Sequence, residues 1–559
     1  MITWAFRVIR ALRNMLMAAV RDPIWAIICI VMAPFRAWNH VLWTLIAFAL
    51  TTVGMIILSL VVAHFLAPHG HNLLLDNVLG VIMIVVVLGV VLRMITTPLL
   101  QHFDYPSAGA ADTHGSARFA TDKETAPLTR SGDGLVIGRD GKTRKLLRYD
   151  GPAHLLTMAP TRSGKGVGTI IPNLLTQRRS IICIDPKGEN AKITTRIRRS
   201  FGSVFVLDPF GITGLPQAAY NPFDSLDPHS PDIAEEAAQL ADALVYDEPG
   251  TAGDVHWNEE ARALVAGIIL YIAETEPRDR RNLSTLREYL TLAPETFREL
   301  LDAMQTITAC HGLIRRAANR HLGKSDREAA GVLSSAQRHT HFLDSPRMSQ
   351  VLGRSDFSFR DLKRSIGTVF LVLPPDRLAT YARWLRLLVT QSLNDMAQAG
   401  GQTASPVLYL LDEFASLGYL APVERAMGLM AGYGVQLWPI LQDIHQLKAV
   451  YGQKAGTFLS NAGVLQVFGV NDHESARLVS DLLGQETVVF QTMARNLDSE
   501  QSGISYSQHH TGRPLMTADE VRTMPEHVEL LFIAQQKPVA AVKVRYYADP
   551  EFKGSFDAA

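Results

Sequence analysis

Cysteine is scarce in this chain of 559 residues, which contains only Cys29, Cys183 and Cys310. These three are far apart, odd in number and without the spacing of metal ligands, so they favour a reducing compartment for the bulk of the chain. A net charge is also lacking, because 54 Lys and Arg balance 54 Asp and Glu. Overall charge therefore indicates neither nucleic acid nor any other partner. No internal repeat or low-complexity tract is apparent, and the length allows more than one domain.

Charged residues are almost absent from two long apolar segments. Val41–Leu66 contains no Lys, Arg, Asp or Glu, and Asn77–Leu100 contains only Arg93, near its end. A helix rises about 1.5 Å per residue, so each segment is long enough to cross a hydrocarbon layer of about 30 Å. Two buried core helices are the alternative, but uninterrupted apolar runs of this length favour membrane spans. We expect a two-helix transmembrane hairpin over residues 41–100.

The flanking arginines predict how this hairpin is oriented. The linker Ala67–Asp76 has no Lys or Arg, whereas basic residues precede the first span and follow the second. The positive-inside rule then places both termini in the cytoplasm. Residues 4–21 mix arginine with apolar residues at helical spacing. This pattern predicts an amphipathic helix on the membrane lipid, within a cytoplasmic N-terminus of residues 1–40. A cleaved signal peptide fits less well, because the apolar run Ile24–Phe35 starts late and is interrupted by Pro34. The arginines before the first span are Arg7, Arg10, Arg13, Arg21 and Arg36.

Short β-branched runs begin at His154 and alternate with helical stretches. Such runs suit buried parallel strands joined by crossover helices, so they predict an α/β fold. Two hairpins are expected outside this rhythm, over Gly134–Tyr149 with a turn at Asp140 and over Val528–Tyr547. Asn471 and Glu474 have capping-box spacing for a helix that Gly484 would end. The expected strands are Ser180–Asp185, Ser203–Asp208, Gly367–Pro374, Val407–Glu413, Gly434–Gln442 and Gly463–Asp472.

Residues 231–357 have a different character, with helical periodicity and no convincing strand. Ile233–Leu244, Glu259–Ala273 and Glu295–Ile314 are the clearest helices. We therefore expect an all-α domain over 231–357, inserted into an α/β domain made of residues 101–230 and 358–559. A basic stretch in the insertion could contact DNA phosphates, although a solvated helix face is the favoured reading. It consists of Arg315, Arg316, Arg320, Lys324 and Arg327.

The stretch APTRSGKGVG, Ala159–Gly168, resembles a phosphate-binding loop. It follows an apolar strand and precedes a helix, so its backbone N–H groups would face a phosphate and Lys165 would reach the β/γ oxygens. Gly166 stands where a Ser or Thr usually ligates Mg²⁺. That ligand would come from elsewhere, with Thr169 or water as candidates. The residues expected to contact the nucleotide are Thr161, Arg162, Ser163, Gly164, Lys165, Gly166 and Val167.

Acidic residues end the apolar run VLYLLDE, Val407–Glu413, as in a Walker B strand. Asp412 would hold Mg²⁺ and Glu413 would polarise the attacking water. Gln442, at the end of the next strand, could sense the γ-phosphate, since an amide both donates and accepts. A buried strand ending in solvated polar residues is the alternative. The phosphate loop makes ATP hydrolysis with Mg²⁺ the favoured interpretation.

At this point the sequence resembles the TraG/TraD-type coupling proteins of type IV secretion and conjugation systems. The resemblance covers the whole chain, including the two-span N-terminus, and members of this family commonly carry GKG at the loop. It implies a RecA-like P-loop ATPase domain with an all-α domain and a hexameric assembly in the bacterial inner membrane. The matching pieces are HGSARFA (114–120), APTRSGKGVGTIIPNLL (159–175), DPKGE (185–189), YNPFD (220–224), HWNEEAR (256–262), LDEFASLG (411–418), LQDIHQLKAVYG (441–452), NAGVLQVFGVND (461–472), RPLMTADEV (513–521) and the ending YYADPEF.

The family also implies partners, which the residues alone do not specify. These are type IV secretion inner-membrane components and a cargo of DNA with its relaxase or of effector proteins. A septal-type DNA translocase is one alternative function, although no winged-helix module is visible at the C-terminus. A membrane receptor that uses ATP only to assemble is another. An arginine acting on the neighbouring subunit's nucleotide would come from Arg383, Arg386, Arg425 or Arg513.

Overall fold

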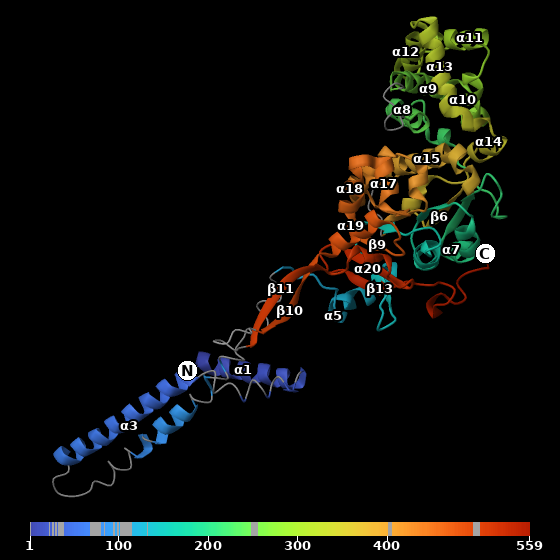
Figure 1. Cartoon of the computed structure of the whole chain (residues 1–559). Coiled ribbons are helices and arrows are strands. Elements are labelled where there is room, and N and C mark those ends of the chain that lie inside the picture. The colour runs from blue at the N-terminus through green and yellow to red at the C-terminus, as the bar shows by residue number, and fades with distance from the viewer. Residues whose placement is uncertain are drawn as a thin grey trace. The chain divides into compact units, whose positions relative to one another are not determined.

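The structure is a computed structural model, and it divides into two compact units (Figure 1). One comprises Met1–Ser116 with Thr487–Gly512, and the other comprises Ala117–Glu486 with Arg513–Ala559. Thr487–Gly512, which the sequence placed with the nucleotide-binding domain, therefore clusters with the N-terminal residues. The structure describes residues 2–21, 38–66, 80–82, 84–92, 114–130, 132–246, 255–400, 405–495 and 504–558, and a few single positions between 23 and 100.

The N-terminal unit contains two long helices. Helix α1 (Ile2–Arg21) covers the expected amphipathic segment, and α3 (Trp38–Leu66) covers the first expected span. Within α3, Leu42–Val61 has a mean hydropathy of 2.3, and among the described residues it is the one stretch long and apolar enough to cross a membrane. Gly80–Leu92 is a shorter apolar helix. The linker and parts of the second expected span lie outside the described residues, so the two-helix hairpin is not confirmed.

An eleven-stranded mixed sheet forms the centre of the larger unit, in the order β2-β1-β13-β12-β9-β3-β8-β7-β4-β6-β5. The strands from β9 to β5 are parallel, and those from β9 to β2 pair antiparallel. Their bounds are β1 (Leu135–Arg139), β2 (Leu146–Tyr149), β3 (His154–Met158), β4 (Ile181–Asp185), β5 (Ser203–Leu207), β6 (Gly367–Val372), β7 (Val407–Leu411), β8 (Val435–Leu441), β9 (Ala462–Val467), β12 (Val528–Ile533) and β13 (Val539–Val542).

The predicted strands are confirmed, because uninterrupted apolar runs can form strands buried on both faces. Both predicted hairpins are confirmed by the antiparallel pairs β1–β2 and β12–β13. Every residue of β3, β4, β6, β7 and β8 is buried. A further pair, β10 (Gln485–Arg495) and β11 (Ile504–Pro514), forms a separate two-stranded sheet that the sequence analysis missed. Helix α19 (His473–Leu483) is capped by Asp472, which accepts a hydrogen bond of 2.8 Å from the backbone N–H of Ser475. The cap expected at Asn471 was therefore wrong by one residue.

Helices follow one another between β5 and β6, and the described residues of this stretch contain no strand. Ile233–Leu244 forms a helix with the predicted bounds. The single helix predicted over Glu295–Ile314 was wrong, because one helix ends at Thr306 and the next begins at Leu313, directly after His311 and Gly312, whose φ angles are 56° and 71°. These helices pack together as the green-to-yellow group in Figure 1. They are α8 (Ile233–Leu244), α9 (Val255–Thr275), α10 (Leu283–Leu290), α11 (Pro294–Thr306), α12 (Leu313–Leu322), α13 (Asp326–Thr340) and α14 (Pro346–Leu352).

Candidate nucleotide-binding site

Three neighbouring strands bring the predicted site residues to one edge of the sheet. The order is β3-β8-β7, and all three strands run parallel. Their carboxyl ends therefore lie together, which is where open α/β sheets bind ligands. Lys165 lies in the loop after β3, Gln442 directly follows β8, and Asp412 directly follows β7. The strand order thus places residues from three separate stretches of sequence side by side.

The loop after β3 turns back on itself and leaves room around its glycines. The backbone N–H and the hydroxyl of Ser163 both donate to the Pro160 carbonyl, at 3.2 and 2.6 Å. Positive φ falls on Arg162 (65°) and Gly164 (95°), while Ala159 needs none, so the missing first glycine of the motif is tolerated. A Cβ at Gly164 or Gly166 would meet no heavy atom within 4 Å. The loop therefore has open space beside it.

A short π-helix carries the end of the loop into the next helix. It spans Gly166–Ile170, and the N–H of Ile171 closes it by donating to the Gly166 carbonyl. Helix α6 (Ile171–Thr176) follows, with Pro172 in its first turn. Proline has no N–H to continue the regular helical pattern, which offers a local reason for the wider turn. Single π turns within helices are frequent at functional sites.

Lys165 contacts the acidic pair that follows β7. Its Nζ forms an ion pair with Oε1 of Glu413 and lies 3.4 Å from Oδ1 of Asp412. On the other side, Nε2 of Gln442 donates a hydrogen bond of 3.0 Å to Oε2 of Glu413. The side chains of Lys165, Asp412 and Glu413 are 12%, 14% and 25% exposed. The four side chains therefore form one connected, partly accessible cluster.

Burial sets the electrostatics of this cluster. Burial raises the pKa of Asp412, and the neighbouring ammonium of Lys165 opposes that shift. Asp185 ends the adjacent strand β4, where burial raises its pKa to about 6 although the N–H of Ala191 donates to its carboxylate at 2.8 Å. From the sequence, Asp185 belongs to the family motif DPKGE, and no role was predicted for it. Its position at the end of a buried strand was the available signal.

Glu413 adopts a backbone conformation that is uncommon for its residue type. Its φ is 51°, in the left-handed region, where a residue other than glycine is under local strain. The backbone N–H and hydroxyl of Ser416 both donate to the Glu413 carbonyl, at 2.8 and 2.6 Å. These bonds hold the turn after β7. The strained residue is thus the one whose carboxylate meets Lys165 and Gln442.

Thr169 is not placed as the substitute metal ligand considered from the sequence. It is fully buried, and its hydroxyl donates to Oε1 of Gln466 at 3.0 Å. Oε1 of Gln466 also accepts from Thr157 of β3 at 2.8 Å, and its Nε2 donates to the buried Glu529 at 2.8 Å. Trp438 extends this network by donating to Thr157 at 2.8 Å. The network supports the loop from within the sheet, and sequence reasoning missed it.

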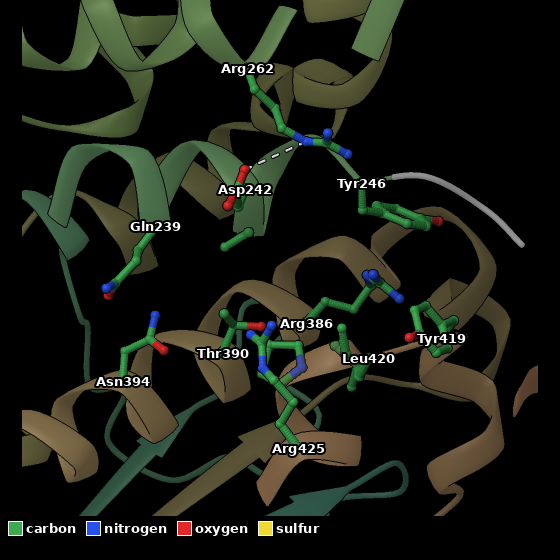
Figure 2. Close-up of a pocket in the computed structure, with 13 residues that line it drawn as sticks. Gln239, Asp242, Tyr246, Arg262, Arg386, Thr390, Asn394, Tyr419, Leu420 and Arg425 are labelled. Carbon is green, nitrogen blue, oxygen red and sulfur yellow. Dashed lines mark ion pairs between the residues drawn. The ribbon is translucent and has the colours of Figure 1, made fainter. Parts of the chain in front are cut away.

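A separate cavity of about 380 Å³ lies between α8 and α9 on one side and α15 (Pro375–Gln398) and α16 (Ala421–Leu429) on the other (Figure 2). Arg386, one of the arginines considered for a neighbouring site, projects into this region. It is 5% exposed, stacks 3.6 Å from the ring centroid of Tyr246 and donates to the Leu417 carbonyl at 2.7 Å. Arg386 therefore supports its own chain here. Arg425 is exposed and lines the same cavity.

The remaining arginine candidates and the basic stretch mostly have partners in the chain. Arg383 donates to the Arg338 carbonyl at 3.0 Å, and Arg513 forms an ion pair with Glu520. Arg320 and Lys324 of the basic stretch both pair with Glu260, at 2.6 and 2.8 Å. These pairs reduce the charge that Arg320 and Lys324 present to solvent.

The donor set suits a magnesium nucleotide. Carboxylate oxygens are the ligands Mg²⁺ prefers, and Asp412 supplies them beside Lys165, with the carboxylate of Glu413 next to it. The open space at Gly164 and Gly166 would admit phosphates close to the loop backbone. Ser163 and Lys165 are partly accessible, and Thr161 and Arg162 are exposed. The residues present therefore fit ATP with Mg²⁺.

A family model describes most of this chain. The family "Type IV secretory system Conjugative DNA transfer" matches residues 118–557. The mixed sheet, with its loop of phosphate-binding pattern and its helical segment, fits a RecA-like NTPase with a helical domain. The chain belongs to this conjugative DNA transfer family, as a coupling protein of the TraG/VirD4 type.

Relatives and solved structures agree with this assignment. The conjugal transfer protein TraG of Escherichia coli is 28% identical over 497 residues, which cover 78% of this chain and 77% of TraG. Protein VirD4 of Rhizobium rhizogenes is 29% identical over 415 residues, covering 72% of this chain and 60% of VirD4. The bacterial conjugative coupling protein TrwBdeltaN70 shares the fold, with a TM-score of 0.61 at 17% identity over 81% of this chain and 99% of TrwB. TrwB has also been solved with ADPNP and with ADP and Mg²⁺, at TM-scores of 0.60 and 0.59.

Proposed function

We propose that this protein is a membrane-bound ATPase that recruits DNA–protein or effector substrates and delivers them to a type IV secretion channel. The observation that carries the proposal is the cluster of Lys165, Asp412, Glu413 and Gln442 at adjacent strand ends, in a chain of the conjugative DNA transfer family. TrwB has been solved with bound nucleotides, which supports the same use of this site here.

Each residue has a role that follows from its position. Backbone N–H groups of Thr161–Val167 and the ammonium of Lys165 hold phosphate oxygens. Asp412 holds Mg²⁺, which supplies charge neutralisation at the phosphates when bound. Glu413 accepts a proton from the attacking water, and Gln442 orients its carboxylate through the 3.0 Å hydrogen bond. Phosphate oxygens would compete with both carboxylates for Lys165, which would release Glu413 to contact water.

The remaining expectations extend this proposal to the whole protein. Residues 231–357 would form the all-α domain, and 101–230 with 358–559 would form the nucleotide-binding domain. The apolar helix α3 supports a location in the bacterial inner membrane, as part of a hairpin with both termini cytoplasmic. We infer a homo-oligomer, and the family resemblance implies that it is a hexamer. It would contact the inner-membrane components of the secretion system.

Steady-state ATP hydrolysis by the full-length, detergent-solubilised protein tests the proposal. We expect turnover that rises when single-stranded DNA is added and that is lost in Lys165→Ala. Lys123→Ala is the matched control, because Lys123 is exposed on the short helix Asp122–Thr125, which contributes no residue to the cluster. Turnover indifferent to DNA, with effector binding intact, would favour a receptor that uses ATP only for assembly. No turnover under any condition would contradict an ATPase.

A further inference from the structure

Lys543 reaches the phosphate loop from the C-terminal end of the sheet. It directly follows β13, and its backbone N–H donates to the His527 carbonyl at 2.8 Å, which fixes where its side chain begins. Its Nζ donates to the Ser163 carbonyl at 2.8 Å and lies 5.2 Å from the ring centroid of Phe468. Lys543 thus holds one specific carbonyl of the loop, although the two residues are 380 positions apart in the sequence.

That carbonyl determines the direction of a neighbouring N–H group. A peptide unit is planar and trans, so the C=O of Ser163 and the N–H of Gly164 point in opposite directions. With its carbonyl held by Lys543, Ser163 directs the Gly164 N–H away from Lys543. Gly164 has a φ of 95°, and a glycine can rotate readily about its N–Cα bond because it has no Cβ. An external anchor on the preceding carbonyl therefore restricts the peptide that joins Ser163 to Gly164.

The same C-terminal segment touches the loop a second time. A Cβ on Gly168 would lie 3.0 Å from the carbonyl oxygen of Val544, so the two backbones are in close contact. On the opposite flank, a Cβ on Gly469 would lie 3.0 Å from Cβ of Ser163. Lys543 and Val544 are consecutive, and they meet the loop at Ser163 and at Gly168. The segment thus braces both ends of the stretch that contains Lys165.

We propose that Lys543 is a positioning residue for the phosphate loop, which it holds in the conformation that binds nucleotide by anchoring the Ser163 carbonyl. The inference rests on the proposed function, because it requires that this loop binds nucleotide. Lys543 acts through the loop backbone. Its loss should therefore affect nucleotide affinity far more than the turnover of bound nucleotide, since preorganised donors reduce the cost of binding.

The test compares Lys543→Met and Lys543→Arg in the full-length protein. Met removes the donor at similar length, whereas Arg keeps an N–H donor. Lys553→Met is the matched control, because Lys553 is exposed in the same C-terminal segment. The measurements are the Kd for ADP with Mg²⁺, KM and kcat for ATP, and the thermal midpoint without nucleotide.

We expect Lys543→Met to weaken ADP binding and raise KM about tenfold, as for loss of one charged hydrogen bond. The value of kcat should stay within about twofold, the thermal midpoint should change little, and Lys543→Arg should restore most of the affinity. Should Lys543→Met fail to fold, Lys543→Gln takes its place. Equal Kd values for Lys543→Met and Lys553→Met would overturn the inference. Absence of ADP binding by the wild-type protein would instead contradict the proposed function.

Discussion

Nε2 of Gln442 donates a hydrogen bond of 3.0 Å to Oε2 of Glu413, which joins the end of β8 to the end of β7. The other oxygen of the same carboxylate faces Lys165. Glu413 is therefore held from two sides, by a neutral amide and by an ammonium. The amide of Gln442, which the sequence suggested as a sensor of the γ-phosphate, is bonded to Glu413 here. We therefore expect only the ammonium to hold phosphate, so the two contacts can be separated by mutation.

Gln442→Ala should lower kcat and leave nucleotide binding nearly unchanged. The amide orients the carboxylate that acts on water, and the Lys165 contact is left in place. We expect kcat to fall by about ten- to a hundredfold, less than the roughly 10²- to 10⁴-fold contribution of a general base, because the base itself is retained. Gln453→Ala, at an exposed position, is the control. A loss of ADP affinity equal to the loss of kcat would show that Gln442 supports the binding site as a whole.

Two glycines, Gly166 and Gly168, should differ in whether they tolerate a small side chain. Gly168→Ala should weaken ATP binding, because the new Cβ would lie 3.0 Å from the backbone oxygen of Val544, which cannot rotate away. Gly166→Ser should be tolerated, since its Cβ meets nothing within 4 Å. Mg²⁺-dependent ATP hydrolysis of both variants tests this contrast. A larger loss for Gly166→Ser than for Gly168→Ala would contradict it.

The buried carboxyl of Glu529 should make stability depend on pH. Burial raises its pKa from about 4.5 to about 8, so the folded chain keeps a proton that the unfolded chain has lost. The contribution of Glu529 to the free energy of unfolding is therefore fully present below the pKa of the unfolded chain, about 4.5. It is lost as pH rises towards the pKa of the folded chain, about 8, by at most about 1.4 kcal/mol per pH unit. Gln466 donates to this carboxyl, and Lys543 is the charged group that faces it.

Glu529→Gln isolates this effect because the amide does not titrate. Thermal midpoints of both proteins should be compared between about pH 6 and about pH 8, where the linkage acts. We expect the wild type to lose more stability with rising pH than Glu529→Gln does. Parallel curves for the two proteins would show that Glu529 does not hold a proton in the folded state.

The positions of the core strands in the α/β domain could be predicted, because these strands are uninterrupted apolar runs with polar ends. Ile233–Leu244 was predicted to its end residues for a similar reason, since its apolar periodicity is strong. The break between Thr306 and Leu313 was missed, because the apolar residues around it continue the helical pattern. Strands β10 and β11 were missed because they form a separate two-stranded sheet whose sequences lack an uninterrupted apolar run.

The loop and acidic pair could be found from local patterns, but their meeting depends on strand order. Placing β8 between β3 and β7 brings Gln442 to Glu413, and no local signal specifies that order. The contacts of Gln466 with Thr169 and of Lys543 with Ser163 join residues far apart in sequence. Such pairs follow from tertiary packing, so spacing alone suggested Thr169 as a metal ligand when its hydroxyl is in fact buried.

ATP hydrolysis by Lys165→Ala and Glu413→Gln, measured beside the wild type in the full-length protein, tests the central claim most directly. The account predicts that Lys165→Ala loses nucleotide binding together with turnover. It predicts that Glu413→Gln retains binding and loses turnover by at least about a hundredfold, because the carboxylate is replaced by an amide that cannot accept the proton. Hydrolysis at the wild-type rate by both variants would contradict the assignment of this site.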